Sequence, residues 1–188
     1  NETLQTLTIG NPALGPQKAK NWDFTLEYYF EPSGSFSVGW FHKSIRDYIV
    51  SGIEVGRIGG GADNGYNGEY EGFTQFTTAN TGTAIAQGWE FSYLQQFRFL
   101  PPMWRGLSLN ANFTLINAHG NFGSNEYRGN GQVAGFIPRT GNVSLSWNYK
   151  KFGTRILYSY TCENIRSYTQ GQPSRNIYMF PRELVNLG

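Results

Sequence analysis

The stretch that decides the fold reads Asn142-Val-Ser-Leu-Ser-Trp-Asn-Tyr149, then Lys150-Lys151, then Phe152-Gly-Thr-Arg-Ile-Leu-Tyr-Ser-Tyr-Thr161. In both arms, large apolar residues share one parity, and Asn, Ser, Thr and Arg occupy most of the other. Period-two alternation closed by a short turn is typical of a β-hairpin. The hairpin therefore has one apolar face and one polar face. The class of fold to which this hairpin belongs depends on which apolar medium covers the apolar face.

The same alternation recurs along the chain, after a first segment (residues 1–17) that we expect to be loop. It predicts strands over residues 20–31, 35–50, 73–99 and 106–115, and the start of another over 177–188. The connections alternate between short (31–34, 100–105, 150–152) and long (51–72, 119–137, 163–176). In an antiparallel meander, alternate connections lie at the same end of the sheet. All short turns are therefore expected at one end and all long loops at the other.

Composition supports β structure and argues against several functions. Aromatic residues make up 16% of the chain and charged residues 15%, against roughly 25% charged in an average soluble domain. The net charge of +2 is weak and the basic residues do not cluster, so no nucleic-acid partner is expected. No apolar run of about 18 residues predicts a transmembrane helix, and no signal peptide is visible. Cys162 is the single cysteine, which leaves either an unpaired thiol or a bridge to another part of the protein.

These features predict an all-β fold, a transmembrane antiparallel β-barrel of outer-membrane type. Such barrels have short periplasmic turns, long extracellular loops, apolar-out alternation and aromatic girdles. Their strands need about 9–11 residues to cross the membrane. Aromatic residues gather near the short-turn end, as a girdle would: Phe30, Phe97, Phe99, Trp104, Tyr149 and Phe152. The alternative is a soluble β-sandwich, whose apolar face meets a second sheet, but a sandwich does not usually sort its loops so strictly by length.

The sequence resembles the TonB-dependent outer-membrane receptors. The likeness lies in the order and spacing of several short stretches: Gly10-Asn-Pro-Ala-Leu14, Asn21-Trp-Asp23, Phe41 through Ile49, Asn80-Thr-Gly82, Gly88-Trp-Glu90 and Leu100 through Gly106. Gln17, Gly15 and Ala19 depart from the usual family residues. The resemblance implies a monomeric barrel of about 22 strands with a plugged lumen. Residues 1–188 would form about seven strands of that single barrel domain, with the plug and the barrel ends outside this sequence.

The resemblance also implies a function. Such receptors import a scarce nutrient (carbohydrate, ferric siderophore, haem or cobalamin) across the bacterial outer membrane. The expected partners are outer-membrane lipid, the extracellular nutrient, and TonB through the N-terminal part that this sequence lacks. No enzymatic activity and no cofactor are expected. The alternatives are a non-transporting outer-membrane barrel, either an adhesin or a porin, and a soluble carbohydrate-binding β-sandwich.

Five charged residues share the polar parity of the strands: Asp23, Glu27, Lys43, Glu90 and Arg155. On the lipid face, a Lys or Arg at the midplane would cost about 2–4 kcal/mol. We therefore predict that these side chains face the lumen, where they pair with one another or with the plug. Direct contact with the ligand is the alternative.

The long loops carry aromatic residues beside amides and charges, with Phe73 and Phe136 nearby. The candidate ligand-binding residues are Tyr66, Tyr70, Phe122, Tyr127 and Tyr168. Aromatic faces flanked by amides suit sugar rings and flat chelates equally well, and plain loop packing is the alternative. No metal site is predicted, because His42 and His119 lack partners at ligand spacing. The acidic residues of the first long loop match no calcium-binding pattern either.

Overall fold

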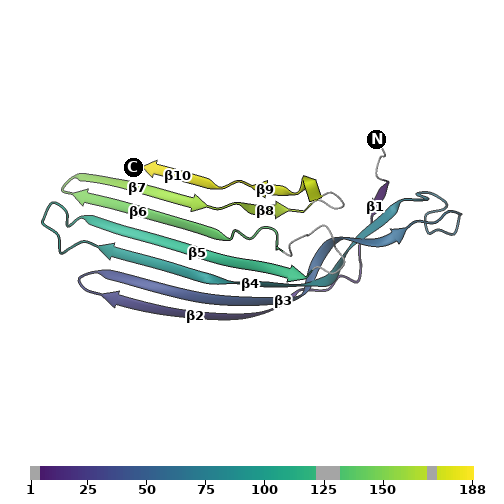
Figure 1. The fold of residues 1–188 in the computed structure, drawn as a ribbon, viewed down its shortest axis with the longest axis horizontal. Helices are drawn as coiled ribbons and strands as arrows, with labels where there is room; N and C mark the ends of the chain where they lie inside the picture. Colours follow the sequence, from purple (N-terminus) through teal and green to yellow (C-terminus); the bar gives the residue numbers. More distant parts are fainter. Residues whose placement is uncertain (1–4, 122–131, 169–172) are drawn as a thin grey trace.

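The computed structural model describes residues 5–121, 132–168 and 173–188. Seven strands form an antiparallel sheet in the order β2–β3–β4–β5–β6–β7–β10 (Figure 1). Their bounds are β2 Lys18–Phe30, β3 Gly34–Arg57, β4 Thr74–Gln96, β5 Leu107–Asn121, β6 Arg139–Tyr149, β7 Phe152–Thr161 and β10 Arg182–Leu187. Each strand therefore pairs with its neighbours in sequence, as the predicted meander requires. The predicted strand over residues 73–99 is one uninterrupted strand, although it is shorter, from Thr74 to Gln96.

Three shorter strands and one 3-10 turn complete the structure. β1 (Thr6–Thr8) pairs in parallel with β4, within a segment predicted to be loop. β8 (Asn164–Ser167) and β9 (Ile177–Met179) form a separate two-stranded ladder, and η1 (Pro173–Arg175) precedes β9. Among the described residues, no helix has the length and apolar character to cross a membrane.

The strand register places the aromatic and polar residues on opposite faces. Directly paired residues lie on the same face of a sheet, so one row can be followed across all seven strands. One such row is Tyr28, Phe36, Tyr93, Ala111, Val143, Tyr158 and Val185. The adjacent row, on the opposite face, is Glu27, Ser37, Ser92, Asn112, Asn142, Ser159 and Leu184. We call the first the aromatic face and the second the polar face.

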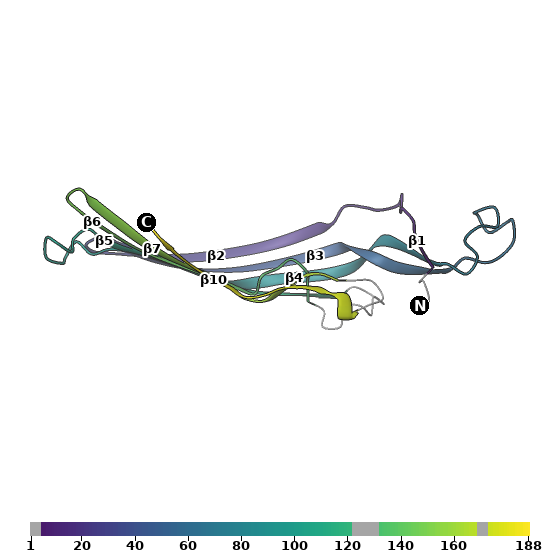
Figure 2. The same cartoon turned by 90° about the horizontal axis from the view of Figure 1, so that it is seen from above.

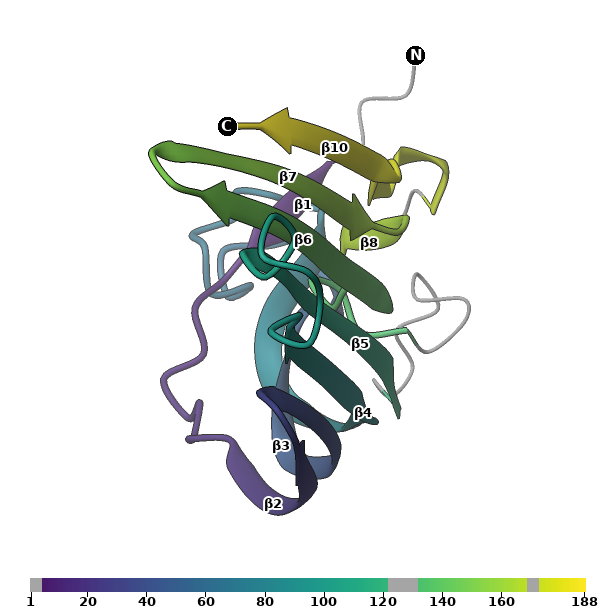
Figure 3. The same cartoon turned by 90° about the vertical axis from the view of Figure 1, so that its left-hand side faces the viewer.

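The described residues supply no second sheet to cover the aromatic face. Trp22 and Phe24 are 69% and 68% exposed, and Tyr28 is 65% exposed. A β-sandwich would bury such side chains against its other sheet. Figure 3 instead shows a single curved layer from β10 to β2. The apolar medium that this face requires must therefore come from outside the described chain.

The connections are sorted by length, as predicted. β2–β3, β4–β5 and β6–β7 are joined at one end of the sheet, and the longer connections leave the other end (Figure 1). The β6–β7 turn contains two residues, and Lys150 has a positive φ of 54°. Near this end the ring centroids of Trp104 and Trp147 lie 6.0 Å apart, and the Trp147 ring stacks on Tyr149. Aromatic rings thus gather near the short turns, where the predicted girdle lies.

β3 is longer than predicted, because residues 51–57 belong to the strand and not to the following loop. After Ile45, the register of β3 against β4 shifts at four places. Gly52 has a φ of 77°, so glycine and bulges here bend a strand without ending it. β2 begins opposite Arg46 and β5 ends opposite Thr83. We call residues 47–82 the projecting hairpin, because they reach past the other strands (Figures 1 and 2).

The small hydrophobic core lies at the long-loop end of the sheet. Val50, Ala84 and Val133 are almost fully buried, and Phe136 packs against them. The segment after β5 also bonds to β8, because the Gly135 N–H donates to the Ile165 carbonyl at 2.9 Å. The chain therefore buries its few core residues where the loops meet the sheet. The strands between the two ends contribute little to this core.

Candidate ligand-binding surface

The connection between β3 and β4, residues 58–73, is organised by one asparagine. The Asn64 amide nitrogen donates to the carbonyls of Gly59 and Glu69 at 3.0 and 2.9 Å. Its amide oxygen accepts from the backbone N–H groups of Tyr66 and Gly68 at 2.8 and 3.0 Å. Both donors and both acceptor positions of the side chain are therefore used. The glycine- and asparagine-rich loop has a defined shape for this reason.

Three aromatic rings meet on this loop. Tyr66 and Tyr70 lie 5.7 Å apart, and Tyr70 and Phe73 lie 5.4 Å apart, both in edge-to-face geometry. Aromatic pairs favour this arrangement over face-to-face stacking. The Gln75 amide donates to the Tyr66 hydroxyl at 2.7 Å, which ties the group to the start of β4. We call Tyr66, Tyr70 and Phe73 the tip cluster.

The tip cluster is open to solvent at the end of the projecting hairpin. Tyr70 is 41% exposed and has a φ of 60°, which is uncommon for a residue with a side chain. A partly exposed ring beside backbone amides can stack on a flat ligand and leave hydrogen-bonding groups at its edge. Sugar rings and planar chelates both have this shape.

Among the described residues, Tyr168 and Phe136 have partners away from this cluster. The Tyr168 hydroxyl donates to the Gln132 carbonyl at 2.6 Å, and Phe136 packs against the small core. Both contacts are explained by loop packing. Phe122 and Tyr127 lie outside the described residues. Of the five candidates, the structure thus brings together Tyr66 and Tyr70, and their contact with a ligand stays a prediction.

The five predicted charges all lie on the polar face. Asp23 pairs in register with Phe41, Glu27 with Ser37, Lys43 with Ala86, Glu90 with Gly39, and Arg155 with Ser146. Within the described ranges, the ion pair recorded joins Lys18 and Asp47 at 3.7 Å, so the five do not pair with one another. The Glu27 carboxylate accepts a hydrogen bond from the Tyr29 hydroxyl, so its local partner is a neutral group. That this face lines a lumen stays a prediction.

The histidines and the cysteine have local partners. His42 Nδ1 lies 3.1 Å from the Gln87 amide oxygen, and His119 Nδ1 lies 3.3 Å from that of Asn117. Cys162 is a buried free thiol whose sulfur accepts from the Arg139 N–H at 3.2 Å. In the part of the chain that the structure describes, no group of three His, Cys, Asp or Glu residues is placed to hold a metal ion.

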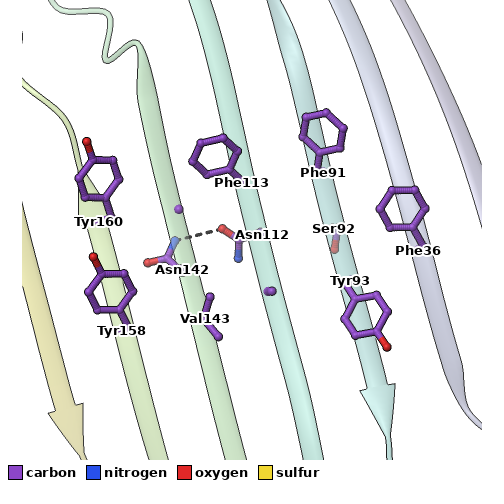
Figure 4. A pocket seen from close by; sticks show the side chains of 12 residues that line it. Phe36, Phe91, Ser92, Tyr93, Asn112, Phe113, Asn142, Val143, Tyr158 and Tyr160 are labelled. Atoms are coloured by element: carbon purple, nitrogen blue, oxygen red, sulfur yellow. Dashed lines mark hydrogen bonds between the residues drawn. The ribbon is translucent and has the colours of Figure 1, made fainter.

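A groove of about 460 Å³ crosses the aromatic face where the strands carry small residues (Figure 4). Ala111 and Gly141 are among its lining residues. The rings of Phe91, Phe113 and Tyr158 stand around it. Polar side-chain atoms contribute almost nothing to its lining. It therefore suits hydrocarbon and not a polar nutrient, and we place the candidate ligand surface at the tip cluster instead.

Sequence reasoning missed the two asparagines that shape the long-loop end, Asn64 and Asn80. Each one stands before or between glycines, in Asp63-Asn-Gly65 and Asn80-Thr-Gly82. That pattern predicts a turn or an irregularity. It does not tell which distant backbone groups the amide will bind.

A known protein family and several solved structures share this fold. The sequence profile described as "TonB dependent receptor-like, beta-barrel" matches residues 1–178. The siderophore receptor PirA from Acinetobacter baumannii superimposes with a TM-score of 0.68 at 16% identity, over 97% of this chain and 26% of that one. A variant of the ferric enterobactin receptor from Pseudomonas aeruginosa, in complex with enterobactin, gives 0.65 at 17% identity, over 96% and 24%.

The FrpB iron transporter from Neisseria meningitidis gives a TM-score of 0.58 at 10% identity, over 97% of this chain and 24% of that one. No curated protein sequence matches the chain. At these identities the structures show the fold, and this chain spans about a quarter of their length. The sheet is a fragment of an antiparallel barrel of outer-membrane type, not closed by the described strands. The chain belongs to the TonB-dependent receptor-like β-barrel family.

Proposed function

We propose that this chain forms part of the barrel wall of a TonB-dependent receptor that imports a scarce nutrient across the bacterial outer membrane. The observation that carries the proposal is the register of the sheet. It separates a continuous aromatic face from a continuous polar face across seven strands. In a membrane barrel, lipid takes the place of the missing second sheet. The uncovered aromatic side chains then have the apolar surroundings that they need.

In this proposal residues 1–188 are part of one barrel domain, and the polar face is directed toward a plugged lumen. The five charges that find no ion-pair partner among the described residues are suited to hold such a plug. The barrel works as a monomer, and contact with TonB is made by a part of the receptor outside this chain.

The nutrient belongs to one of four classes: a ferric siderophore, a carbohydrate, haem or cobalamin. The tip cluster supports this range, since the exposed ring of Tyr70 can stack on a flat ligand face. Of the structures with the same fold, one is named as a siderophore receptor, one as a ferric enterobactin receptor and one as an iron transporter. Ferric siderophores are therefore the first class to test.

The test is an uptake measurement in the native bacterium, with the full-length gene present or deleted. Cells are given a radiolabelled member of each class, with and without a protonophore that removes the energy supplied through TonB. We expect uptake of one class to be lost on deletion and also on de-energisation. Uptake that depends on the gene but survives the protonophore would indicate a porin. Loss of surface attachment with no uptake defect would indicate an adhesin.

The tip cluster has its own test, with Tyr70→Ala as the variant and Tyr168→Ala as the matched control. A stacked aromatic ring contributes on the order of 1 kcal/mol beyond its buried area, so nutrient affinity should fall about fivefold or more for Tyr70→Ala. The control removes a tyrosine of the packed loop and should leave affinity within twofold. Binding is measured on the purified full-length receptor in detergent. Equal affinities for the two variants would contradict this placement of the ligand surface.

A further inference from the structure

The segment before β2 is bound along the projecting hairpin. β1 pairs with residues 74–76 of β4, and the Ile9 N–H donates to the Phe76 carbonyl at 2.9 Å. The Thr77 hydroxyl donates to the Ile9 carbonyl at 3.1 Å, and the Asn11 amide donates to the Thr78 carbonyl at 2.9 Å. These contacts use two carbonyls and one side-chain hydroxyl of β4, beyond the point where β5 ends. The projecting hairpin therefore has a third chain segment beside it.

Asn80 joins this segment to both strands of the hairpin. The Gly15 N–H donates to the Asn80 amide oxygen at 2.7 Å, and the Asn80 amide nitrogen donates back to the Gly15 carbonyl at 2.9 Å. The same nitrogen donates to the Asp47 carbonyl at 2.8 Å. Asp47 has a φ of 56° at one of the irregular places in β3. One amide thus connects the N-terminal segment, β4 and the irregular part of β3.

The hairpin needs such a connection because of its length. A two-stranded hairpin on its own is marginally stable in water, and this one carries register shifts along β3. Each arm extends about ten residues past the sheet, which corresponds to roughly 33 Å at about 3.3 Å per residue. Over that length, a 10° change of direction at the base moves the tip by about 6 Å. The position of the tip cluster therefore depends on how firmly the base is held.

We propose that Asn80 is a positioning residue, which fixes the direction of the projecting hairpin and with it the location of the tip cluster. It does this by holding Gly15 on one side and Asp47 on the other. The proposal concerns the shape of the long-loop end and is independent of which nutrient is imported. Two stretches that are 65 residues apart in the chain, Gly10 through Gly15 and Asn80-Thr-Gly82, meet in this one contact.

The test uses the full-length receptor in the outer membrane of intact cells. Chymotrypsin cleaves after aromatic residues, so the tip cluster itself provides the cleavage sites. Asn80→Ala removes all three hydrogen bonds, and we expect cleavage within residues 58–73 to become about tenfold faster, while the barrel still migrates as a folded species before heating. The matched control is Asn110→Ala, an asparagine in the regular part of β5, which should leave the cleavage rate within twofold of wild type.

Asn80→Asp separates hydrogen bonding from side-chain size. The carboxylate keeps the acceptor for the Gly15 N–H but brings negative charge against the carbonyls of Gly15 and Asp47. Its cleavage rate should therefore be at least that of Asn80→Ala. Wild-type cleavage rates for Asn80→Ala and Asn80→Asp in a folded barrel would overturn the proposal.

A second variant decides the matter if Asn80→Ala fails to assemble. Asn11→Ala removes the hydrogen bond to the Thr78 carbonyl and the local one from the Ala13 N–H, and leaves Asn80 in place. Cleavage about threefold faster than wild type supports the proposal, and an unchanged rate overturns it.

The last measurement rests on the proposed function. In uptake assays, a tip cluster that is no longer held in position should raise KM by about tenfold and leave kcat unchanged, because the wall and the energised step are untouched. A lowered kcat at unchanged KM would overturn the positioning role. Absence of uptake in wild-type and variant cells alike would count against import, while the cleavage result, obtained without any nutrient, would still decide the role of Asn80.

Discussion

Strands β3 and β4 run through both the regular sheet and the projecting hairpin, yet the two regions are held in different ways. Where β4 runs against β5, fourteen consecutive pairs keep one register from Thr83 to Gln96. Where β4 pairs with the part of β3 that follows Ile45, the register shifts four times. In the first region the backbone ladder is unbroken. The second depends on the side-chain amides of Asn64 and Asn80.

The difference teaches where function can vary in this architecture. A one-residue slip in the regular sheet would exchange the aromatic and polar faces of a strand, so this region allows little change. In the projecting hairpin, the bulges and glycines reset the register locally without affecting the wall. In the proposed receptor, a loop at its end can therefore be reshaped for a new ligand while the barrel stays intact.

The largest expected effect is a charge on the aromatic face of the wall. Val143→Lys places an ammonium group among Ala111 and Tyr158, and we expect it to destabilise the folded barrel by about 2–4 kcal/mol. Ser144→Lys, one residue on, lies on the polar face and is expected to cost less than about 1 kcal/mol if water reaches that face. Urea unfolding of the full-length barrel in lipid vesicles measures both. Similar losses for the two variants would contradict the assignment of the faces.

A smaller effect is expected from adding one methyl group where the strands approach closely. A Cβ on Gly88 would lie 2.0 Å from the Leu115 carbonyl oxygen, whereas the nearest atom to a Cβ on Gly39 is 3.6 Å away. Gly88→Ala should therefore cost about 1–3 kcal/mol through overpacking, and Gly39→Ala should be nearly neutral. The same unfolding experiment compares them, and a neutral Gly88→Ala would show that the strands separate readily.

In the projecting hairpin, a glycine-to-alanine substitution acts through the backbone conformation and not through packing. Gly52 has a φ of 77°, and Gly52→Ala should cost roughly 1–2 kcal/mol locally because a Cβ disfavours that conformation. We expect faster chymotrypsin cleavage of residues 58–73, with the urea midpoint of the barrel unchanged. A lowered midpoint with unchanged cleavage would mean that the hairpin and the wall unfold together.

The smallest effect is expected at the ion pair beside Asp47. Lys18 and Asp47 lie 3.7 Å apart, with side chains 74% and 49% exposed. Exposed pairs contribute about 0–1 kcal/mol, so Lys18→Ala should change the cleavage rate of residues 58–73 by less than twofold. A tenfold increase in the cleavage rate would show that this ion pair, and not the Asn80 amide, positions the hairpin.

The sequence predicts the regular wall well because that region obeys one local rule. Alternation assigned residues such as Glu27, Val143 and Trp147 to faces that the register confirms. The extension of β3 over residues 51–57 escaped prediction, since Gly52 and Gly56 look like loop residues when their pairing partners are unknown. The tip cluster was predicted in part, because its tyrosines lie close in sequence. The role of Asn80 could not be predicted, since its partners Gly15 and Asp47 are brought to it only by the fold.

The measurement that tests the central claim most directly is a nitroxide scan of residues 142–147 in the full-length receptor in lipid vesicles. Collision with oxygen reports lipid, and collision with a water-soluble nickel complex reports water. We predict that oxygen collisions peak at residues 143, 145 and 147, and that nickel collisions, where water enters the lumen, peak at 142, 144 and 146. A profile without this alternation, or one with nickel collisions highest at 143, 145 and 147, would contradict the account.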